Sequence, residues 1–263
     1  MGPGGVVIDI GDVPVWLGTS DPALVQILEQ RYAKFLSPTL PPLLHFDITV
    51  VPPDALAGDI DLTVRSRDGR WSLERGDFRA EWDMQTRRGR IQQTLSPYAA
   101  DSVLRIIHTL VLSTQGGFLQ HAASVVRGGR AFLFTGPSGA GKTTIARLAP
   151  PDATLLSDEI SYVRRIGDRY VAFGTPFAGE LGKAGEPECA PLAAIYRLER
   201  GENVVEPLAQ RDAVRSVMQN VLFFSGDPAL TAGVFASVCD CVSTVPVRRL
   251  AFRPDARVWD VIA

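Results

Sequence analysis

Lysine is the basic residue that this chain almost lacks. Of the 27 lysines and arginines, only Lys34, Lys142 and Lys183 are lysines. The net charge is −2, and the sequence contains no long run of like charge. Proteins that bind nucleic acid generally carry a basic surface that attracts phosphates. We therefore expect no nucleic-acid partner.

Cysteine and long apolar runs are also scarce. Cys189, Cys239 and Cys241 form no paired C-x-x-C sets, which excludes a zinc site of that kind and a disulfide framework. No apolar span reaches the 18 residues of a membrane helix, and residues 1–5 lack the basic and apolar regions of a signal peptide. Apolar residues still make up 46% of the chain, enough for a buried core. We therefore expect a cytoplasmic globular protein with no membrane partner.

One of the three lysines lies in a phosphate-binding pattern, G-x-x-x-x-G-K-[ST]. The stretch reads Gly136-Pro137-Ser138-Gly139-Ala140-Gly141-Lys142-Thr143-Thr144. An apolar run with strand character, residues 131–134, precedes it, and residues 144–148 follow with helical spacing. A random match is expected about three times per thousand sequences of this composition. The sequence thus predicts a nucleotide site at a strand-to-helix turn; the alternative is a glycine-rich turn without a ligand.

Each part of the motif has a role in holding a nucleotide. Glycines allow backbone N–H groups to surround a polyphosphate, and the helix N-terminus adds partial positive charge. Lys142 is expected to reach the β- and γ-phosphates, and Thr143 to offer its hydroxyl to Mg²⁺. The predicted cofactors are ATP and Mg²⁺. The predicted nucleotide-binding residues are Gly136, Ser138, Gly139, Ala140, Gly141, Lys142, Thr143 and Thr144.

Two acids, Asp158 and Glu159, follow an apolar strand downstream of the loop. An acid at this place can hold Mg²⁺ or accept the proton of an attacking hydroxyl, and both roles suit a kinase. The alternative is a solvated turn between two strands. That alternative is stronger for Glu159, because adjacent residues of a strand point to opposite faces.

A histidine and a loop complete the set of candidate site residues. His121 lies on the strand expected to pair with the one leading into the phosphate loop, where it would orient Asp158 through a hydrogen bond. A lone strand histidine is more often structural. Lys183 is a candidate lid cation, and Thr175 and Glu180 would shape the acceptor pocket. A merely solvated Lys183 and a surface acid at Glu180 are the alternatives.

The chain divides into two predicted domains. Residues 1–95 are predicted as a small β-rich α+β domain for substrate recognition or as a scaffold, an antiparallel sheet or meander with one helix. Its strands are expected at 6–10, 13–17, 45–51, 61–66, 70–75, 78–83 and 89–95, with the helix at 23–35. Residues 96–263 are predicted as an α/β catalytic domain. Its helices are expected at 98–113, 211–221 and 229–242, and its strands at 118–126, 131–134, 154–156, 161–164, 170–173, 192–198 and 247–252.

The segment from His121 through the phosphate loop to Asp158 and Glu159 resembles the HPr serine kinase/phosphorylase family. The resemblance covers residues 117–165 and implies a P-loop kinase domain of the type shared with phosphoenolpyruvate carboxykinases. It also implies that Asp158 is the general base that deprotonates a substrate serine, and the acid when phosphate returns. The chain departs from the family at Thr144, where members carry Glu, and at Glu159, where they carry Asp.

Residues 174–180 and 190–196 look like divergent HPr-kinase-like proteins, some of which belong to lasso-peptide clusters and phosphorylate a precursor peptide. The resemblance implies an ATP-dependent serine kinase that acts on a peptide or small protein, such as a lasso-peptide precursor. Two alternatives stay open: a nucleotide-binding regulator whose catalysis has lapsed, and a kinase for a small metabolite. Assembly as a homo-oligomer also stays open.

Overall fold

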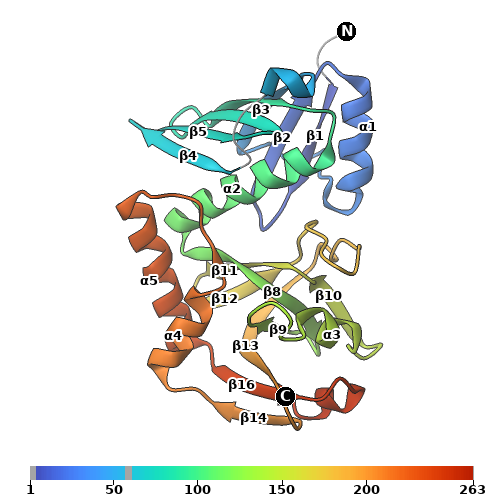
Figure 1. The fold of residues 1–263 in the computed structure, drawn as a ribbon, viewed down its shortest axis with the longest axis vertical. Coiled ribbons are helices and arrows are strands. Elements are labelled where there is room, and N and C mark those ends of the chain that lie inside the picture. The colour runs from blue at the N-terminus through green and yellow to red at the C-terminus, as the bar shows by residue number, and fades with distance from the viewer. Residues whose placement is uncertain (1–3, 57–60, 263) are drawn as a thin grey trace. The chain divides into compact units, whose positions relative to one another are not determined.

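The computed structural model describes residues 4–56 and 61–262. The chain forms two compact units, each of which contains helices and a sheet (Figure 1). One unit consists of residues up to 108 together with 224–227, and the other of residues 109–223 together with residues from 228 onward. The predicted domain boundary at 95/96 precedes the helix α2 (Pro97–Gln115), whereas the two compact units divide within this helix. The fold is thus mixed α/β with two sheets, the coarse class that the sequence predicts.

The first unit contains a seven-stranded sheet in the order β1-β2-β3-β7-β6-β5-β4. Its strands are β1 (Gly4–Asp9), β2 (Pro14–Thr19), β3 (Leu44–Val50), β4 (Thr63–Arg67), β5 (Arg70–Arg75), β6 (Phe78–Asp83) and β7 (Arg88–Gln93). The prediction of an antiparallel meander is correct for β4 to β7 but wrong for β3, which runs parallel to both β2 and β7. The reason is the long helical connection between β2 and β3, because parallel neighbours require a crossover.

That crossover contains α1 (Pro22–Arg31) and a short 3₁₀ segment, Ala33–Phe35; a second 3₁₀ segment covers Pro53–Leu56. Asp21 caps α1 by accepting the amide hydrogens of the two residues that follow Pro22, and Leu24 and Leu28 are buried. At the end of α1, Arg31 and Tyr32 bind the carboxylate of Asp101 on α2, at 2.5 and 2.6 Å. The buried Asp101 thus ties α1 to α2.

The second unit contains a nine-stranded sheet that closes on itself in part. β8 pairs with β11, β11 with β12, β12 with β13, β13 with β9, and β9 again with β8. The strands are β8 (Gly117–Arg127), β9 (Arg130–Thr135), β10 (Ala153–Ser157), β11 (Ile160–Ile166), β12 (Arg169–Phe173), β13 (Cys189–Arg200), β14 (Val204–Pro207), β15 (Val221–Leu222) and β16 (Val247–Phe252). β14 and β15 were not predicted, because segments this short carry no periodic pattern.

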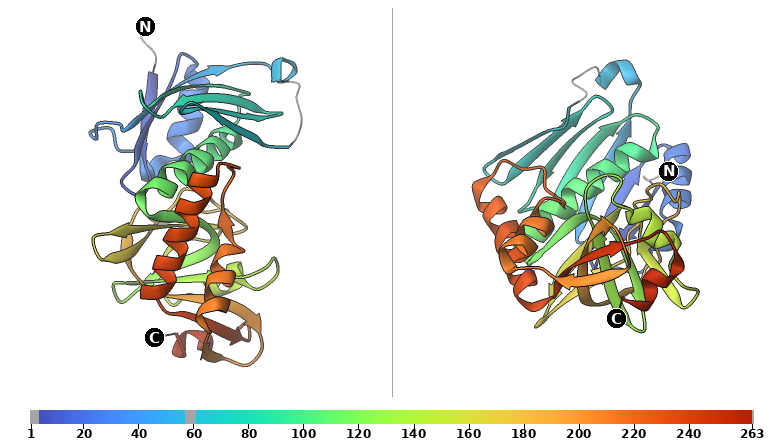
Figure 2. Two further views of the ribbon diagram at one scale, coloured as in Figure 1. Left: turned by 90° about the vertical axis from the view of Figure 1, so that its left-hand side faces the viewer. Right: turned by 60° about the horizontal axis from the view of Figure 1, so that its bottom comes forward.

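Helices cover this sheet on two sides, and α4 and α5 lie side by side (Figures 1 and 2). The helices are α3 (Lys142–Arg147), α4 (Gln210–Met218), α5 (Pro228–Thr244) and the 3₁₀ segment Ala256–Asp260. Val217 of α4 and Val238 of α5 belong to one apolar cluster with the strands. Ile145 of α3 packs with Val258 and Trp259 in a second cluster. The sheet is therefore buried between two helical layers.

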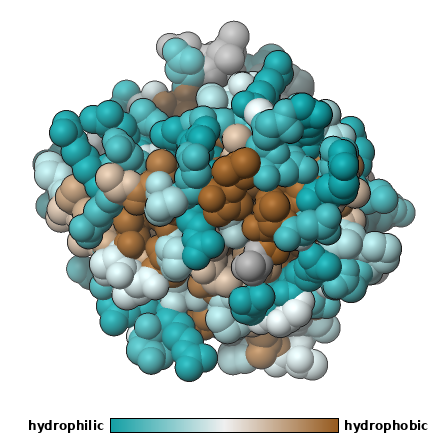
Figure 3. Space-filling model, turned by 90° about the horizontal axis from the view of Figure 1, so that it is seen from below, coloured by the Kyte–Doolittle hydropathy of each residue, from teal (hydrophilic) through white to brown (hydrophobic). Residues whose placement is uncertain are grey.

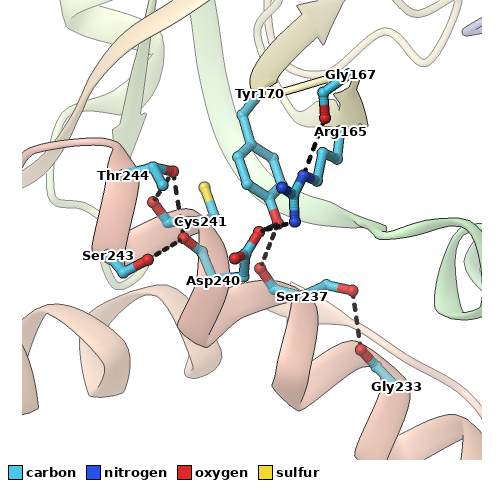
Figure 4. A network of polar contacts seen from close by, with 9 residues as sticks. All are labelled: Arg165, Gly167, Tyr170, Gly233, Ser237, Asp240, Cys241, Ser243 and Thr244. Carbon is cyan, nitrogen blue, oxygen red and sulfur yellow. Dashed lines mark hydrogen bonds and ion pairs between the residues drawn. The ribbon is translucent and has the colours of Figure 1, made fainter.

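A polar network fixes α5 against β11 and β12 (Figure 4). The Tyr170 hydroxyl lies 2.8 Å from the Asp240 carboxylate and 3.0 Å from the Ser237 carbonyl. Arg165 donates to the same carboxylate at 2.9 Å and to the Gly167 carbonyl at 3.1 Å. Tyr170 itself is 4% exposed, so its hydroxyl needs these partners to offset the loss of water.

The surface of the end where β14 and β16 lie is a mosaic in which apolar patches alternate with hydrophilic side chains (Figure 3). Such a mixture is ordinary for protein surfaces. Within residues 4–56 and 61–262, no helix has the length and apolarity required to cross a membrane.

Candidate active site

The phosphate-loop sequence joins β9 to α3, as the sequence predicts, although α3 starts earlier than expected and has six residues. Gly139 and Gly141 adopt φ of +76° and +102°, which L side chains rarely occupy. A Cβ on Gly141 would lie 2.7 Å from Cζ of Phe252, whereas one on Gly139 would meet no atom within 4 Å. Gly141 is therefore needed both for its backbone conformation and for the close approach of Phe252.

Lys142 is held against its own loop. Its ammonium donates to the carbonyl oxygens of Gly136 at 3.0 Å and Pro137 at 3.3 Å, and the residue is 8% exposed. Burial lowers the pKa of Lys142, and the negative charges of Glu180 and Glu159 oppose that shift. A positive charge thus lies under the loop next to a cleft that carries acids.

Asp158 and Glu159 lie between β10 and β11, two strands that both pair with β8. β10 pairs with residues 124–127 of β8 and β11 with residues 117–121, so the two strands run in line, with a bulge between Leu155 and Ser157. The Ser157 hydroxyl accepts the amide hydrogens of Glu159 and Ile160 at 3.2 and 2.9 Å. The acids are therefore not a solvated turn. Because they lie outside regular strand geometry, both line the same cleft.

The carboxylate of Asp158 is fixed by the loop that follows β12. Its two oxygens accept the backbone amides of Gly179 and Leu181, both at 2.8 Å, and the residue is 3% exposed. A Cβ on Gly179 would lie 2.8 Å from that of Glu159 and 3.0 Å from an Asp158 oxygen. The amides of this loop therefore orient the Asp158 carboxylate, and the orienting role that the sequence gives to His121 stays a prediction.

One cleft of about 600 Å³ brings most of the predicted residues together. It is lined by His121, Ser138, Gly139, Gly141, Lys142, Thr143, Thr144, Asp158, Glu159, Ala178, Gly179 and Glu180. His121 projects from β8 as an exposed residue, directly opposite Ile160 of β11. The predicted histidine, phosphate loop and paired acids therefore share one cleft.

Four predicted residues do not line this cleft: Gly136, Ala140, Thr175 and Lys183. Thr175 is fully buried, and its hydroxyl donates to the Ile160 carbonyl at 2.8 Å, so it supports the turn below the acids and does not line the cleft. Lys183 is exposed and lies outside the cleft lining. Gly136 is buried and receives the Lys142 ammonium. A substrate role for Thr175 or Lys183 stays a prediction that this cleft does not support.

Sequence reasoning missed the anchoring role of the loop at 178–181. Gly179 and Leu181 act through backbone amides, which no side-chain motif reveals. The available signal was the glycine in Ala178-Gly179-Glu180, because a glycine often marks a close backbone approach.

The cleft also offers oxygen ligands that suit Mg²⁺. Thr143 supplies a hydroxyl, and Asp158 and Glu159 supply carboxylates, the ligand types that this hard cation prefers. The described residues contain no group of three or more His, Cys, Asp and Glu that could hold a metal by themselves. Magnesium in phosphate-transfer sites commonly binds one or two protein groups and completes its shell with phosphates and water. The residues present thus fit a substrate-associated Mg²⁺.

The fold and the cleft define a mixed α/β protein with a phosphate-loop sequence beside a polar cleft. Residues 92–263 match the family described as "SynChlorMet cassette protein ScmC", and the chain belongs to that family. Among solved structures, the chain is similar to the Hpr(Ser) kinase/phosphatase from Coxiella burnetii. That likeness has 13% identity and a TM-score of 0.29, and covers 51% of this chain and 78% of the other. No curated protein matches the chain.

Proposed function

We propose that this protein is an ATP-dependent kinase that transfers the γ-phosphate to a serine hydroxyl of a peptide or small protein. The observation that carries the proposal is that Lys142 and the loop glycines share one cleft with Asp158 and His121. Phosphoryl transfer requires little covalent chemistry from the protein, and depends on positioning and on charge stabilisation. A cleft with a cation on one side and a fixed carboxylate on another suits that task.

In the proposed reaction the serine oxygen forms a bond to the γ-phosphorus, and the bond from that phosphorus to the β–γ bridging oxygen breaks. The serine proton passes to the carboxylate of Asp158, and ADP leaves with the electron pair. Asp158 suits this role because hydrogen bonds from two backbone amides set the orientation of its carboxylate. Each oxygen keeps a second lone pair, which can accept the serine proton. Its fixed position removes the need to order the base during the reaction.

Lys142 would move from the carbonyl oxygens of its own loop to the β- and γ-phosphates when the nucleotide binds. Thr143, with Asp158 or Glu159, would hold Mg²⁺, which neutralises developing charge on the phosphates when bound. His121 would orient Asp158, and Glu180, which lines the same cleft, would contact the peptide. Because ATP is the phosphate donor, the proposed reaction takes place in the cytoplasm.

For the two proposed domains, we assign catalysis to residues 96–263 and recognition of the substrate to residues 1–95. We propose a lasso-peptide precursor as the phosphate acceptor, because residues 174–180 and 190–196 resemble HPr-kinase-like proteins that phosphorylate such precursors. The chain could carry out the same transfer as a monomer or as a homo-oligomer.

The test is incubation of the full chain with γ-labelled ATP, Mg²⁺ and peptides encoded beside its gene, followed by identification of the labelled residue. Label in a serine supports the proposal. Nucleotide binding without transfer to any peptide would contradict it and indicate a regulator. Label that appears only in a small metabolite would indicate a metabolite kinase.

A further inference from the structure

A second cleft, of about 660 Å³, also borders the phosphate loop. It shares Gly139, Gly141 and Thr144 with the first cleft, so the loop forms a wall of both. Its remaining lining residues are Ala140, Arg200, Gly201, Glu202, Phe252, Arg253 and Pro254. None of the acids of the first cleft, Asp158, Glu159 or Glu180, lines the second.

The sheet topology explains why these residues meet at the loop. β9 and β16 run parallel to β13 on its two sides, with Thr135 opposite Arg197 and Phe252 opposite Arg200. The carboxyl ends of the three strands therefore reach the same edge of the sheet. In open α/β sheets, ligands bind in the crevice outside the carboxyl ends of parallel strands. The second cleft occupies this position.

A nucleoside triphosphate whose phosphates lie on the loop must extend in two directions. Its γ-phosphate end has to face the base and the acceptor, which the proposed function places in the first cleft with Asp158. The nucleoside end must then leave the loop on the opposite side, past Gly139, Gly141 and Thr144. These three residues are the ones that continue into the second cleft.

The chemistry of the second cleft suits a nucleoside. Arg200 and Arg253 offer planar guanidinium groups that stack on aromatic rings and donate hydrogen bonds. Glu202 offers an acceptor for ribose hydroxyls or base amino groups. Arg253 pairs with Glu202, and its backbone amide donates to Asn203 at 2.9 Å, so the two charged groups are already placed together.

Two contacts connect this cleft to the phosphate loop. Arg200 donates to the Gly139 carbonyl at 3.4 Å. The ring of Phe252, which is 5% exposed, lies against Gly141 so closely that any Cβ there would collide with it. Phosphates on the loop and a group in the second cleft would thus contact neighbouring parts of one surface.

We infer that the second cleft binds the nucleoside half of the phosphate donor, with Arg200 and Arg253 against the base and ribose. This inference rests on the proposed function, because the direction of the nucleotide follows from the position of Asp158. It assigns a ligand to residues that lie outside the phosphate-loop motif.

The test compares the binding of ATP with that of tripolyphosphate, which lacks the nucleoside, by calorimetry of the full chain with Mg²⁺. The Arg200→Ala/Arg253→Ala double variant should weaken ATP binding by about tenfold or more and change tripolyphosphate binding by less than about twofold. Arg257→Ala is the matched control, because Arg257, like Arg253, follows β16 in the chain. Arg257 forms an ion pair with Asp255, and neither residue lines the second cleft. That variant should bind both ligands as the unaltered protein does.

Intact tripolyphosphate binding also shows that the double variant is folded. Equal losses for ATP and tripolyphosphate would overturn the inference, since the arginines would then act on the phosphates. An unchanged ATP affinity would overturn it as well, while leaving the proposed kinase function in place. Failure of the unaltered protein to bind ATP would overturn both.

Discussion

The backbone amide of Gly179 donates a 2.8 Å hydrogen bond to the carboxylate of Asp158. This contact joins the loop after β12 to the interruption between β10 and β11, and Leu181 adds a second amide to the other oxygen. A buried carboxylate that accepts two amide hydrogens is held in one orientation. The candidate base is therefore set by the fold of the loop before any substrate arrives.

Asp158→Asn should lower phosphotransfer by roughly 100-fold or more, because the proposed reaction requires this carboxylate to accept the serine proton. ATP affinity should change little, since the phosphate loop is untouched. The measurement is single-turnover transfer from labelled ATP, combined with calorimetry of ATP binding. Glu180→Gln, an exposed acid of the same cleft, is the control and should retain much more transfer activity. Equal activity of Asp158→Asn and the unaltered protein would remove Asp158 from the mechanism.

Lys142→Met should weaken ATP binding by roughly tenfold or more, because the phosphates lose a charge-assisted contact. Burial lowers the Lys142 pKa, so its charged form is lost at a lower pH than the ordinary 10.5. ATP affinity of the unaltered protein should therefore fall as the pH rises through that lowered pKa. Lys142→Arg keeps its charge and should lose this pH dependence. Titrations of ATP at several alkaline pH values test both points, and identical pH profiles for the two proteins would contradict them.

Gly141→Ala should impair nucleotide binding far more than Gly139→Ala. Both substitutions place a side chain at positive φ, which costs roughly 1–2 kcal/mol. Only the Cβ at position 141 also collides with Phe252, so the loop there must shift. Calorimetry with ATP and thermal unfolding of the two variants make the comparison. Equal effects would show that backbone strain alone matters at this loop.

Stability should fall with acidification because of His108. Burial lowers its pKa from 6.5 to about 3, so below pH 6.5 the unfolded chain binds a proton that the folded chain does not. The free energy of unfolding should then decrease by about 1.4 kcal/mol per pH unit from this group, from about pH 6.5 down to about pH 3. Urea unfolding at pH 7, 5 and 4 should show a shallower dependence for His108→Leu. The half-buried His45, changed to Gln, is the control; a slope unchanged in His108→Leu would refute the assignment.

Tyr170→Phe should destabilise the second unit by about 1–2 kcal/mol, because the change leaves the Ser237 carbonyl and the Asp240 carboxylate with one partner fewer. Thermal unfolding measures the effect. Ser243→Ala removes an exposed hydroxyl that bonds the Asp240 carbonyl at 2.7 Å, and it should cost less. A smaller loss for Tyr170→Phe than for Ser243→Ala would show that Tyr170 does not hold α5.

Local patterns in the sequence predicted elements well where the relevant interactions are near in the chain. The strands at 70–75, 78–83 and 247–252 have the predicted bounds, since alternation and turn residues mark them directly. The parallel pairing of β3 with β2 and β7 was not predicted, because strand order depends on partners that are far apart in the sequence. The buried position of Thr175 was missed for the same reason: it depends on a contact with Ile160.

The sequence by itself determined the phosphate loop. Under the proposed function, its glycines and its lysine act through backbone conformation and charge within nine consecutive residues, so the pattern can be recognised without a fold. Only the tertiary structure decided what faces that loop. The anchoring of Asp158 by Gly179, the common cleft with His121, and the second cleft at Arg200 and Arg253 all join segments that are distant in the chain. Such contacts arise from strand pairing and packing, which no local pattern encodes.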